Sequence, residues 1–345
     1  MNFNSMNDLL LHKYRNEFRS GNDLSPEDSE DLFGSLVTSD DVKLIAELLL
    51  AWNDKGTSDD ELFLFASIMR RRMKRIDLRS NSCVDIVGTG GSGAKTFNVS
   101  TAAALVISGA GVPVAKHGNR AATSKSGSFD CLSLLGVNAD VDPSITQQCF
   151  DELRICFMFA PRFHALSSTL AEARRSLRAP SVFNNLGPLC NPASAPHQVI
   201  GVWNTDLIGK TAGALARLGT KRSWIVHGDG GLDEIALIGE TLVAEICEQS
   251  IQTFTITAKD FGIDNFAGNL SNCTATESAN LIKEILNNMH KGEDDEKLVL
   301  INAAAAIYIA ARASSLRSAY SIAEESLRSG AAMETLTKLV ELTKQ

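Results

Sequence analysis

Apolar side chains recur at helical spacing over the first 77 residues. Apolar positions three and four residues apart occur in the stretches 32–36, 42–49 and 62–68, a pattern typical of helices that bury one face. Ser25-Pro26-Glu27 and Ser58-Asp59-Asp60 precede two of these stretches. Each combines a serine that can cap a helix with an acidic first turn. The pattern predicts an all-helical domain over residues 1–77.

From residue 78 onward, short apolar runs alternate with helical patterns. The predicted strands are 83–87, 112–115, 155–159, 199–203 and 224–226, with helices such as 145–153 and 207–218 between them. This alternation indicates βα units and a mainly parallel sheet flanked by helices. We also expect an antiparallel hairpin over 242–256, an irregular loop over 265–275, and helix from Glu277 to the end. The predicted fold class is therefore α/β, with a small helical domain beside a larger α/β domain.

The first predicted strand is followed by four glycines, Gly88, Gly90, Gly91 and Gly93. Glycine lets the backbone adopt positive φ and bring its N–H groups close to a ligand. Ser100 and Thr101 stand where we expect the N-cap of the next, alanine-rich helix, so its dipole and free N–H groups would point back to the loop. This arrangement predicts an anion site that suits phosphate.

Two other glycine-rich motifs do not fit. A dinucleotide site needs its last glycine to open the helix and an acidic residue about 20 positions further on. Here seven residues separate Gly93 from Thr101, and the next strand ends in the basic run Lys116-His117-Gly118-Asn119-Arg120. The spacing around Lys95, and the register of strand, loop and helix, differ from those of a Walker loop. A phosphate site of another kind remains the prediction.

Net charge limits the partners. The chain has 345 residues and a net charge of −8, so it lacks the general basic field with which nucleic-acid binders attract phosphates. The basic run 70–75 ends a predicted helix. Helix C-termini favour cations, which favours a solvent-exposed helix end over an anion site there. We expect no nucleic-acid partner, and we expect local basic residues elsewhere to bind small anions.

No membrane partner is expected either. The uncharged stretch 96–115 contains Pro113 and glycines, which break it into loop, helix and strand. Residues 1–23 lack the apolar core of a signal peptide. The seven cysteines form no CxxC pair, so we expect reduced, mostly buried thiols. These features predict a cytoplasmic protein.

Several blocks of sequence together carry a family resemblance. They are the glycine loop 85–101, Lys116-His117-Gly118-Asn119-Arg120, Ser126-Gly127-Ser128, and the stretches 183–192, 227–234, 302–306 and 329–330. With them the chain resembles the anthranilate phosphoribosyltransferases of tryptophan biosynthesis over nearly its whole length. The resemblance implies a helical domain that mediates homodimers, joined by hinges to an α/β domain over 78–345, with the active site in the cleft. We expect helices from about 165–190 to join the helical domain.

The resemblance also implies a binding site for phosphoribosyl pyrophosphate (PRPP). Its ligands would be Gly88, Thr89, Gly90, Gly91, Ser92, Gly93, Thr96, Asn98, Ser100, Thr101, Lys116 and Ser128. Ser100 and the adjacent carboxylates Asp233 and Glu234 are the implied ligands of Mg²⁺, which prefers oxygen, with two ions expected per subunit. No covalent nucleophile is expected, because the main demands are to stabilise the departing pyrophosphate and to align the amine.

Anthranilate, the implied acceptor, is a planar amine with an ortho carboxylate. Arg174 matches the carboxylate-binding arginine of the family, and a guanidinium suits a carboxylate through its bidentate geometry. Arg175 lies about 100° away around the helix and is expected to face outward. The other implied acceptor-site residues are Gly88, His117, Asn119, His164, Gly187 and Pro188.

Departures from the family pattern leave alternatives open. Ser92 stands where the family usually has Asp, and Ala165 replaces the usual Pro after His164. The implied reaction transfers the phosphoribosyl group of PRPP to anthranilate, giving N-(5-phosphoribosyl)anthranilate and pyrophosphate. The scaffold also suits another aromatic amine, a pyrimidine nucleoside phosphorylase-like enzyme, or a non-catalytic binding module. Arg174 favours an acceptor with a carboxylate, and the retained glycine loop argues against the binding module.

Overall fold

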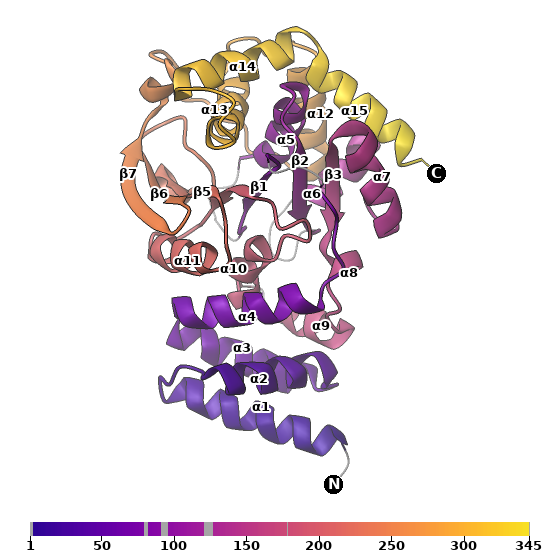
Figure 1. Cartoon of the computed structure of the whole chain (residues 1–345), viewed down its shortest axis with the longest axis vertical. Helices are drawn as coiled ribbons and strands as arrows, with labels where there is room; N and C mark the ends of the chain where they lie inside the picture. The colour runs from indigo at the N-terminus through magenta and orange to yellow at the C-terminus, as the bar shows by residue number, and fades with distance from the viewer. Residues whose placement is uncertain (1–2, 79–81, 91–95, 121–126, 178, 345) are drawn as a thin grey trace.

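The computed structural model describes residues 3–78, 82–90, 96–120, 127–177 and 179–344. Within these residues the chain forms a helical unit at its N-terminus and a larger unit around one seven-stranded sheet (Figure 1). The predicted fold class, a small helical domain beside a larger α/β domain, is confirmed.

The helical unit begins with α1 (Phe3–Arg19), α2 (Pro26–Thr38), α3 (Val42–Lys55) and α4 (Asp59–Arg72). Ser25 Oγ accepts a hydrogen bond from the Asp28 N–H at 3.1 Å. Ser58 and Glu61 exchange the two bonds of a capping box. Both predicted helix starts are therefore confirmed, because each serine satisfies an N–H group that the helix leaves unpaired.

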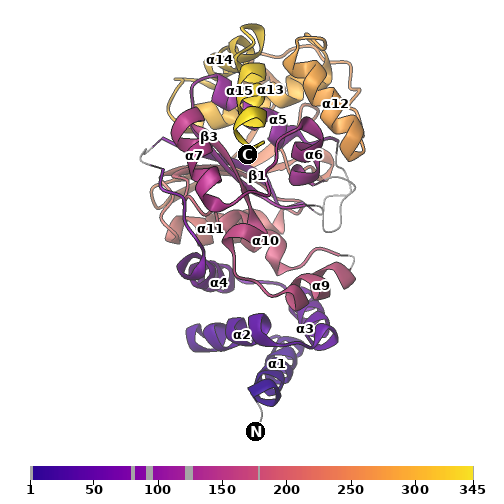
Figure 2. The ribbon, with the colours of Figure 1, turned by 90° about the vertical axis from the view of Figure 1, so that its right-hand side faces the viewer.

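A later stretch of chain lies beside the helical unit. It contains α8 (Ala160–Phe163), α9 (Ser168–Ser176) and α10 (Val182–Leu189). α9 packs against α2 and α3, and α10 lies between α4 and the sheet (Figures 1 and 2). Two stretches of chain that are distant in sequence thus meet on the same side of the sheet.

The sheet has the order β3-β2-β1-β4-β5-β6-β7. Its strands are β1 (Val84–Gly88), β2 (Val114–Gly118), β3 (Ile155–Phe159), β4 (His197–Gly201), β5 (Arg222–Gly228), β6 (Thr241–Cys247) and β7 (Ser250–Ile256). The strands β1 to β5 are parallel, whereas β6 and β7 are antiparallel. The mainly parallel sheet and the hairpin are both confirmed.

Helices cover both faces of the sheet (Figure 2). One face carries α5 (Val99–Gly109), α6 (Ser128–Leu135), α7 (Pro143–Leu153), α12 (Ala275–Leu286), α13 (Asp294–Ile309), α14 (Leu316–Arg328) and α15 (Ala331–Leu342). The other carries α10, α11 (Asp206–Arg217) and the helical unit. The short 3-10 helices η1 (Asp229–Gly231) and η2 (Ala258–Phe261) follow β5 and β7.

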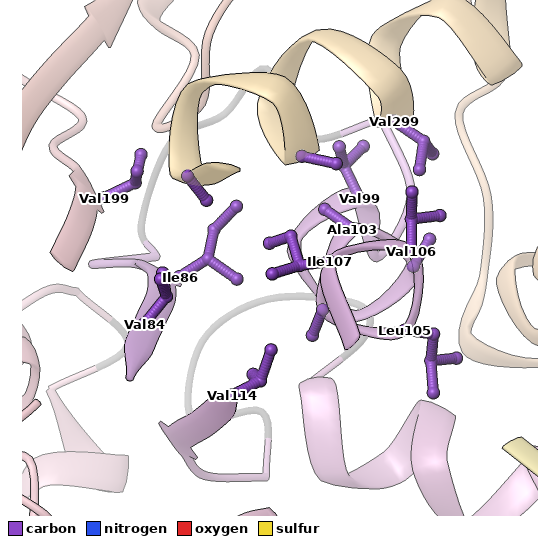
Figure 3. Packing of buried hydrophobic residues seen from close by; sticks show 14 of the residues in the cluster. Val84, Ile86, Val99, Ala103, Leu105, Val106, Ile107, Val114, Val199 and Val299 are labelled. Carbon is purple, nitrogen blue, oxygen red and sulfur yellow. The ribbon is translucent and has the colours of Figure 1, made fainter. Parts of the chain in front are cut away.

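Neighbouring strand residues enter different cores. Ile86 points toward Ile107 of α5 (Figure 3), whereas Val87 belongs to the core shared with the helical unit. Val199 and Ile200 divide in the same way. The strands β1 and β3 are buried on both faces, and their sequences are largely apolar rather than alternating. The helical unit therefore shares a core with the sheet.

Several predicted element ends differ from the structure, among them those of β2, predicted over 112–115, and β5, predicted over 224–226. The helix α5 begins at Val99 and has Asn98 at its N-cap position, so the predicted N-cap at Ser100 and Thr101 is wrong. Asn98 is held from another helix, because its Oδ1 accepts a hydrogen bond from Ser278 Oγ at 2.9 Å. The strand β4 begins at His197, two residues earlier than predicted. Such tertiary contacts leave no signal in local sequence.

Candidate active site

A cavity of about 460 Å³, called the cleft below, opens where the two units meet. It lies beyond the C-terminal ends of β1 and β2, the edge at which parallel α/β sheets bind ligands. The helices α5, α9 and α10 supply further walls, and Met69 of α4 reaches the cleft from the helical unit. Both units therefore build the candidate active site.

A loop that carries two carboxylates crosses the sheet at two glycines. A Cβ atom on Gly88 would lie 2.3 Å from Asp233 Oδ2, and one on Gly201 would lie 1.7 Å from the Asp233 carbonyl oxygen. Side chains larger than hydrogen therefore do not fit at these positions. Asp233 Oδ2 also accepts a hydrogen bond from the Gly90 N–H at 2.7 Å. This contact fixes the loop of Asp233 and Glu234 against the glycine loop.

Lys116 places a buried cation beside the cleft. Its side chain is 1% exposed, and its Nζ donates to the Ile86 carbonyl oxygen and to Ser100 Oγ, the latter at 3.3 Å. Ser100 lies in the first turn of α5, where the helix dipole is positive. An ammonium group beside a helix N-terminus favours the binding of phosphate.

Most of the residues implied for PRPP line the cleft. They are Gly88, Thr89, Gly90, Asn98, Ser100, Lys116 and Ser128. Thr96 and Thr101 are buried and do not line it. Gly91, Ser92 and Gly93 lie outside the described residues. The implied metal ligands Ser100, Asp233 and Glu234 also line the cleft.

All the residues implied for the acceptor line the same cleft, namely Gly88, His117, Asn119, His164, Arg174, Gly187 and Pro188. His117 Nδ1 lies 3.1 Å from the Gly187 carbonyl oxygen and therefore carries a proton that it donates. The Nε2 atoms of His117 and His164 are 3.2 Å apart. Because His117 has already donated from Nδ1, its Nε2 can only accept when the ring is neutral.

The histidine pair is held neutral by its surroundings. Burial lowers the pKa of His164 to about 4. Burial and the neighbouring His164 lower the pKa of His117 well below 6.5. At neutral pH neither ring therefore offers a positive charge to a carboxylate in the cleft.

Arg174 supplies the cation that the histidines do not. Its Nε is buried and has no hydrogen-bond partner within the part of the chain that the structure describes. The guanidinium lies over the ring of Phe183, 5.1 Å from the centroid. Burial lowers its pKa to about 10, so it stays charged at neutral pH. Arg175 is exposed, as predicted. An unpaired cation over an aromatic face suits a planar carboxylate.

Comparisons with known proteins agree with this geometry. Residues 80–333 match the model of the α/β domain of a glycosyl transferase family. An anthranilate phosphoribosyltransferase of Methanosarcina barkeri is 42% identical, over 94% of this chain and 88% of its own. One of Rhodopirellula baltica is 40% identical, over 98% of this chain and 97% of its own. This chain belongs to the anthranilate phosphoribosyltransferase family.

Solved structures of anthranilate phosphoribosyltransferases share the fold. The enzyme of Thermus thermophilus superposes with a TM-score of 0.86 at 34% identity, over 96% of this chain and 99% of its own. The Saccharomyces cerevisiae enzyme in complex with PRPP and Mg gives 0.86 at 30% identity, over 97% of this chain and 98% of its own. The resemblance inferred from the sequence is confirmed, and the chain is a transferase of this family.

The buried hydrogen-bond centre at Asp85 was not predicted from the sequence. Asp85 of β1 accepts hydrogen bonds from the His117 N–H at 3.2 Å, from Asn191 Nδ2 at 2.7 Å and from Gln198 Nε2 at 3.2 Å. Burial raises the pKa of Asp85 to about 6, although the charge of Lys116 and these bonds lower it. An acidic residue inside an apolar run was the only sequence signal. Asp85 orients the strand end that carries His117.

Several cleft residues have no distinguishing sequence signal. Met69, Leu166 and Ala171 form apolar wall, and their spacing alone is that of ordinary core residues. Asn184 is different, because its Nδ2 donates to the Thr89 carbonyl oxygen at 3.2 Å. It thereby joins the acceptor side of the cleft to the glycine loop.

Proposed function

We propose that this chain transfers the phosphoribosyl group of PRPP to the amine of anthranilate, releasing pyrophosphate, in tryptophan biosynthesis. The observation that carries the proposal is the unpaired Arg174 guanidinium, which faces the same cleft as the anion-binding groups Ser100 and Lys116. One cavity thus contains one cationic group for a carboxylate and another for a phosphorylated sugar.

The donor half of the cleft supplies hydrogen-bond donors and cations. Ser100 Oγ, in the first turn of α5, and Lys116 can share the charge of phosphate groups. Asp233 and Glu234 offer adjacent carboxylate oxygens to Mg²⁺, and PRPP would complete the coordination. Bound Mg²⁺ supplies positive charge that stabilises the departing pyrophosphate. We infer two ions per subunit, and in the saccharomycete relative Mg is bound together with PRPP.

The acceptor half aligns the amine. Arg174 binds the carboxylate, and Phe183 and Met69 exclude water from the aromatic ring. The neutral His117 and Asn119 line the side of the cleft that faces the polar edge of the acceptor. With the ring held, the amine faces the ribose as pyrophosphate leaves, so orientation replaces a covalent intermediate. A relative in complex with 4-fluoroanthranilate superposes with a TM-score of 0.85 at 28% identity.

A nucleobase acceptor fits this cleft less well. A pyrimidine has no carboxylate, so Arg174 would stay buried beside it without a counter-charge, which is costly. Another aromatic amine with an ortho carboxylate would satisfy Arg174 equally. The geometry therefore favours an aminobenzoate over a base.

The test is the loss of anthranilate fluorescence with PRPP and Mg²⁺ present, compared with reactions that lack PRPP or contain EDTA. Loss only in the complete mixture supports the proposal. Consumption of uracil or thymine with phosphoribosyl or ribosyl transfer, and none of anthranilate, would favour the phosphorylase-like alternative.

We also infer a homodimer that forms through the helical unit, acting in the cytoplasm. Large apolar side chains are exposed there, namely Met6 and Leu9 on α1 and Leu50 on α3, with exposed fractions of 54%, 56% and 45%. Burial of such side chains drives association. Among the described helices none is long and apolar enough to cross a membrane, and all seven cysteines are free thiols.

A further inference from the structure

A second cavity, called the arginine pocket below, lies at the opposite edge of the sheet from the cleft. It has a volume of about 420 Å³. It lies near the N-terminal ends of β4 and β5, where α4 and α11 run side by side (Figure 1). Four arginines line it, Arg70, Arg71, Arg75 and Arg217, and none of the described lining residues is acidic. Its described lining is separate from that of the cleft.

The four arginines are unequally neutralised. Arg71 pairs with Glu30 and Arg217 with Asp60, both outside the lining. Arg75 Nη2 donates only to the Arg70 carbonyl oxygen, at 3.2 Å, and among the described residues no carboxylate lies within 4.0 Å of it. The pocket therefore carries positive charge on a chain whose net charge is −8.

Arg70 is the inner cation of the pocket, so the run 70–75 is not simply the solvent-exposed helix end that the sequence favoured. Its Nε donates to the Leu189 carbonyl oxygen at 2.7 Å and its Nη1 to the Leu218 carbonyl oxygen at 3.2 Å. Burial lowers the pKa of Arg70, and the charge of Arg75 lowers it further. The two carbonyl groups accept hydrogen bonds from Arg70 without cancelling its charge. Arg70 and Arg75 are thus two nearby cations whose repulsion an anion would offset.

The arginine pocket contacts the back of the helix that forms the acceptor wall. Leu189 ends α10, and Gln198, which lines the pocket, donates to the Pro188 carbonyl oxygen at 3.0 Å. Pro188 itself lines the cleft. On α4, Met69 lines the cleft and the next residue, Arg70, lines the arginine pocket. A ligand that draws α4 and α11 together would therefore act on both sides of the acceptor site.

We propose that the arginine pocket binds a small multivalent anion that carries a phosphate group, and that its binding strengthens acceptor binding in the cleft. Guanidinium groups bind phosphate by paired, charge-assisted hydrogen bonds, and two of the four that line the pocket, Arg70 and Arg75, have no carboxylate partner among the described residues. An anion held between Arg75 after α4 and Arg217 of α11 would bridge the helical unit and the α/β unit. The bridge would brace α10 and so pre-organise the acceptor wall.

Calorimetric titration with inorganic phosphate tests the binding site. The variants are Arg75→Gln, which leaves every ion pair described above intact, and Arg312→Gln as a control that removes an exposed charge elsewhere. We expect the wild type and Arg312→Gln to show a binding event that is roughly tenfold or more weaker in Arg75→Gln. Because the cleft can also bind phosphate, binding to the arginine pocket is measured by the difference in phosphate affinity between Arg75→Gln and Arg312→Gln. Identical isotherms for all three proteins would overturn the site and leave an adventitious ion only.

Kinetic measurements test whether anion binding in the arginine pocket strengthens acceptor binding in the cleft. This coupling rests on the proposed function, whereas the calorimetric titration is independent of it. At saturating PRPP, phosphate no longer competes in the cleft. We expect added phosphate to lower the KM for anthranilate several-fold in the wild type and in Arg312→Gln, but not in Arg75→Gln. A KM that phosphate leaves unchanged in the wild type would overturn the coupling. A protein without transferase activity that still shows the calorimetric difference would overturn the proposed function and retain the site.

Discussion

At the scale of a single residue, we propose that Arg174 selects the acceptor, because its buried Nε has no hydrogen-bond partner among the described residues of the cleft wall. Replacing it with Ala should raise the KM for anthranilate roughly 10- to 150-fold, since a hydrogen bond to a charged group is worth about 1.5–3 kcal/mol. The KM for PRPP should change little. Arg175→Ala is the matched control, because the neighbouring guanidinium is exposed. An equal loss for both substrates would place Arg174 in the phosphate site or the core.

The histidine pair links residue chemistry to the pH dependence of stability. The pKa of His164 is lowered from 6.5 to about 4 by burial, so between these values the unfolded chain binds the proton and the folded chain does not. Stability is therefore lost as pH falls from 6.5, by about 2 kcal/mol at pH 5 from His164 alone. Asp85 opposes this, because its raised pKa lets the folded chain bind a proton up to about pH 6. Urea unfolding at pH 7 and pH 5 should show that the free energy of unfolding falls less in His164→Gln than in the wild type. An equal fall in both proteins would contradict the claim that the buried histidine pair is neutral.

At the scale of elements, α10 couples the two halves of the cleft. Asn184 Oδ1 accepts the Ser181 N–H at 3.0 Å while its Nδ2 donates to the Thr89 carbonyl oxygen. Asn184→Asp keeps the cap, loses the donor and adds a negative charge to the cleft wall, so we expect the KM for PRPP to rise by at least the roughly 2- to 12-fold that one hydrogen bond is worth. Asn287→Asp, whose side chain caps a distant helix, is the control. A KM for PRPP that matches the wild type would show that the contact does not position the loop.

Helices and strands were predictable from the sequence where one buried face, or one spacing of apolar residues, dominates the local pattern. The caps at Ser25 and Ser58 and the hairpin of β6 and β7 follow from local rules, and the structure contains all of them. The start of α5 did not follow, because Asn98 is held by Ser278 from 180 residues away. Met69 likewise reaches the cleft only through the packing of two units. Glycine, lysine and carboxylate motifs predict the candidate site, whereas apolar wall residues look like core.

At the scale of the whole molecule, the exposed apolar residues of α1 and α3 predict a dimer. Light scattering after size exclusion should give about twice the chain mass of 37.1 kDa. Leu9→Glu combined with Leu50→Glu should give a folded monomer, because both side chains are exposed within one chain. Met289→Glu, at an exposed residue on the far unit, should leave the mass unchanged. A wild type that elutes as a monomer would contradict the inferred interface.

The central proposal for the whole molecule is that a phosphorylated sugar and an aminobenzoate react within the shared cleft. The most direct measurement is quantitative mass spectrometry of a reaction that contains PRPP, Mg²⁺ and anthranilate. The account predicts N-(5-phosphoribosyl)anthranilate and pyrophosphate in equal amounts, each matching the anthranilate consumed. Pyrophosphate release without this product, or anthranilate left intact while PRPP is consumed, would contradict it.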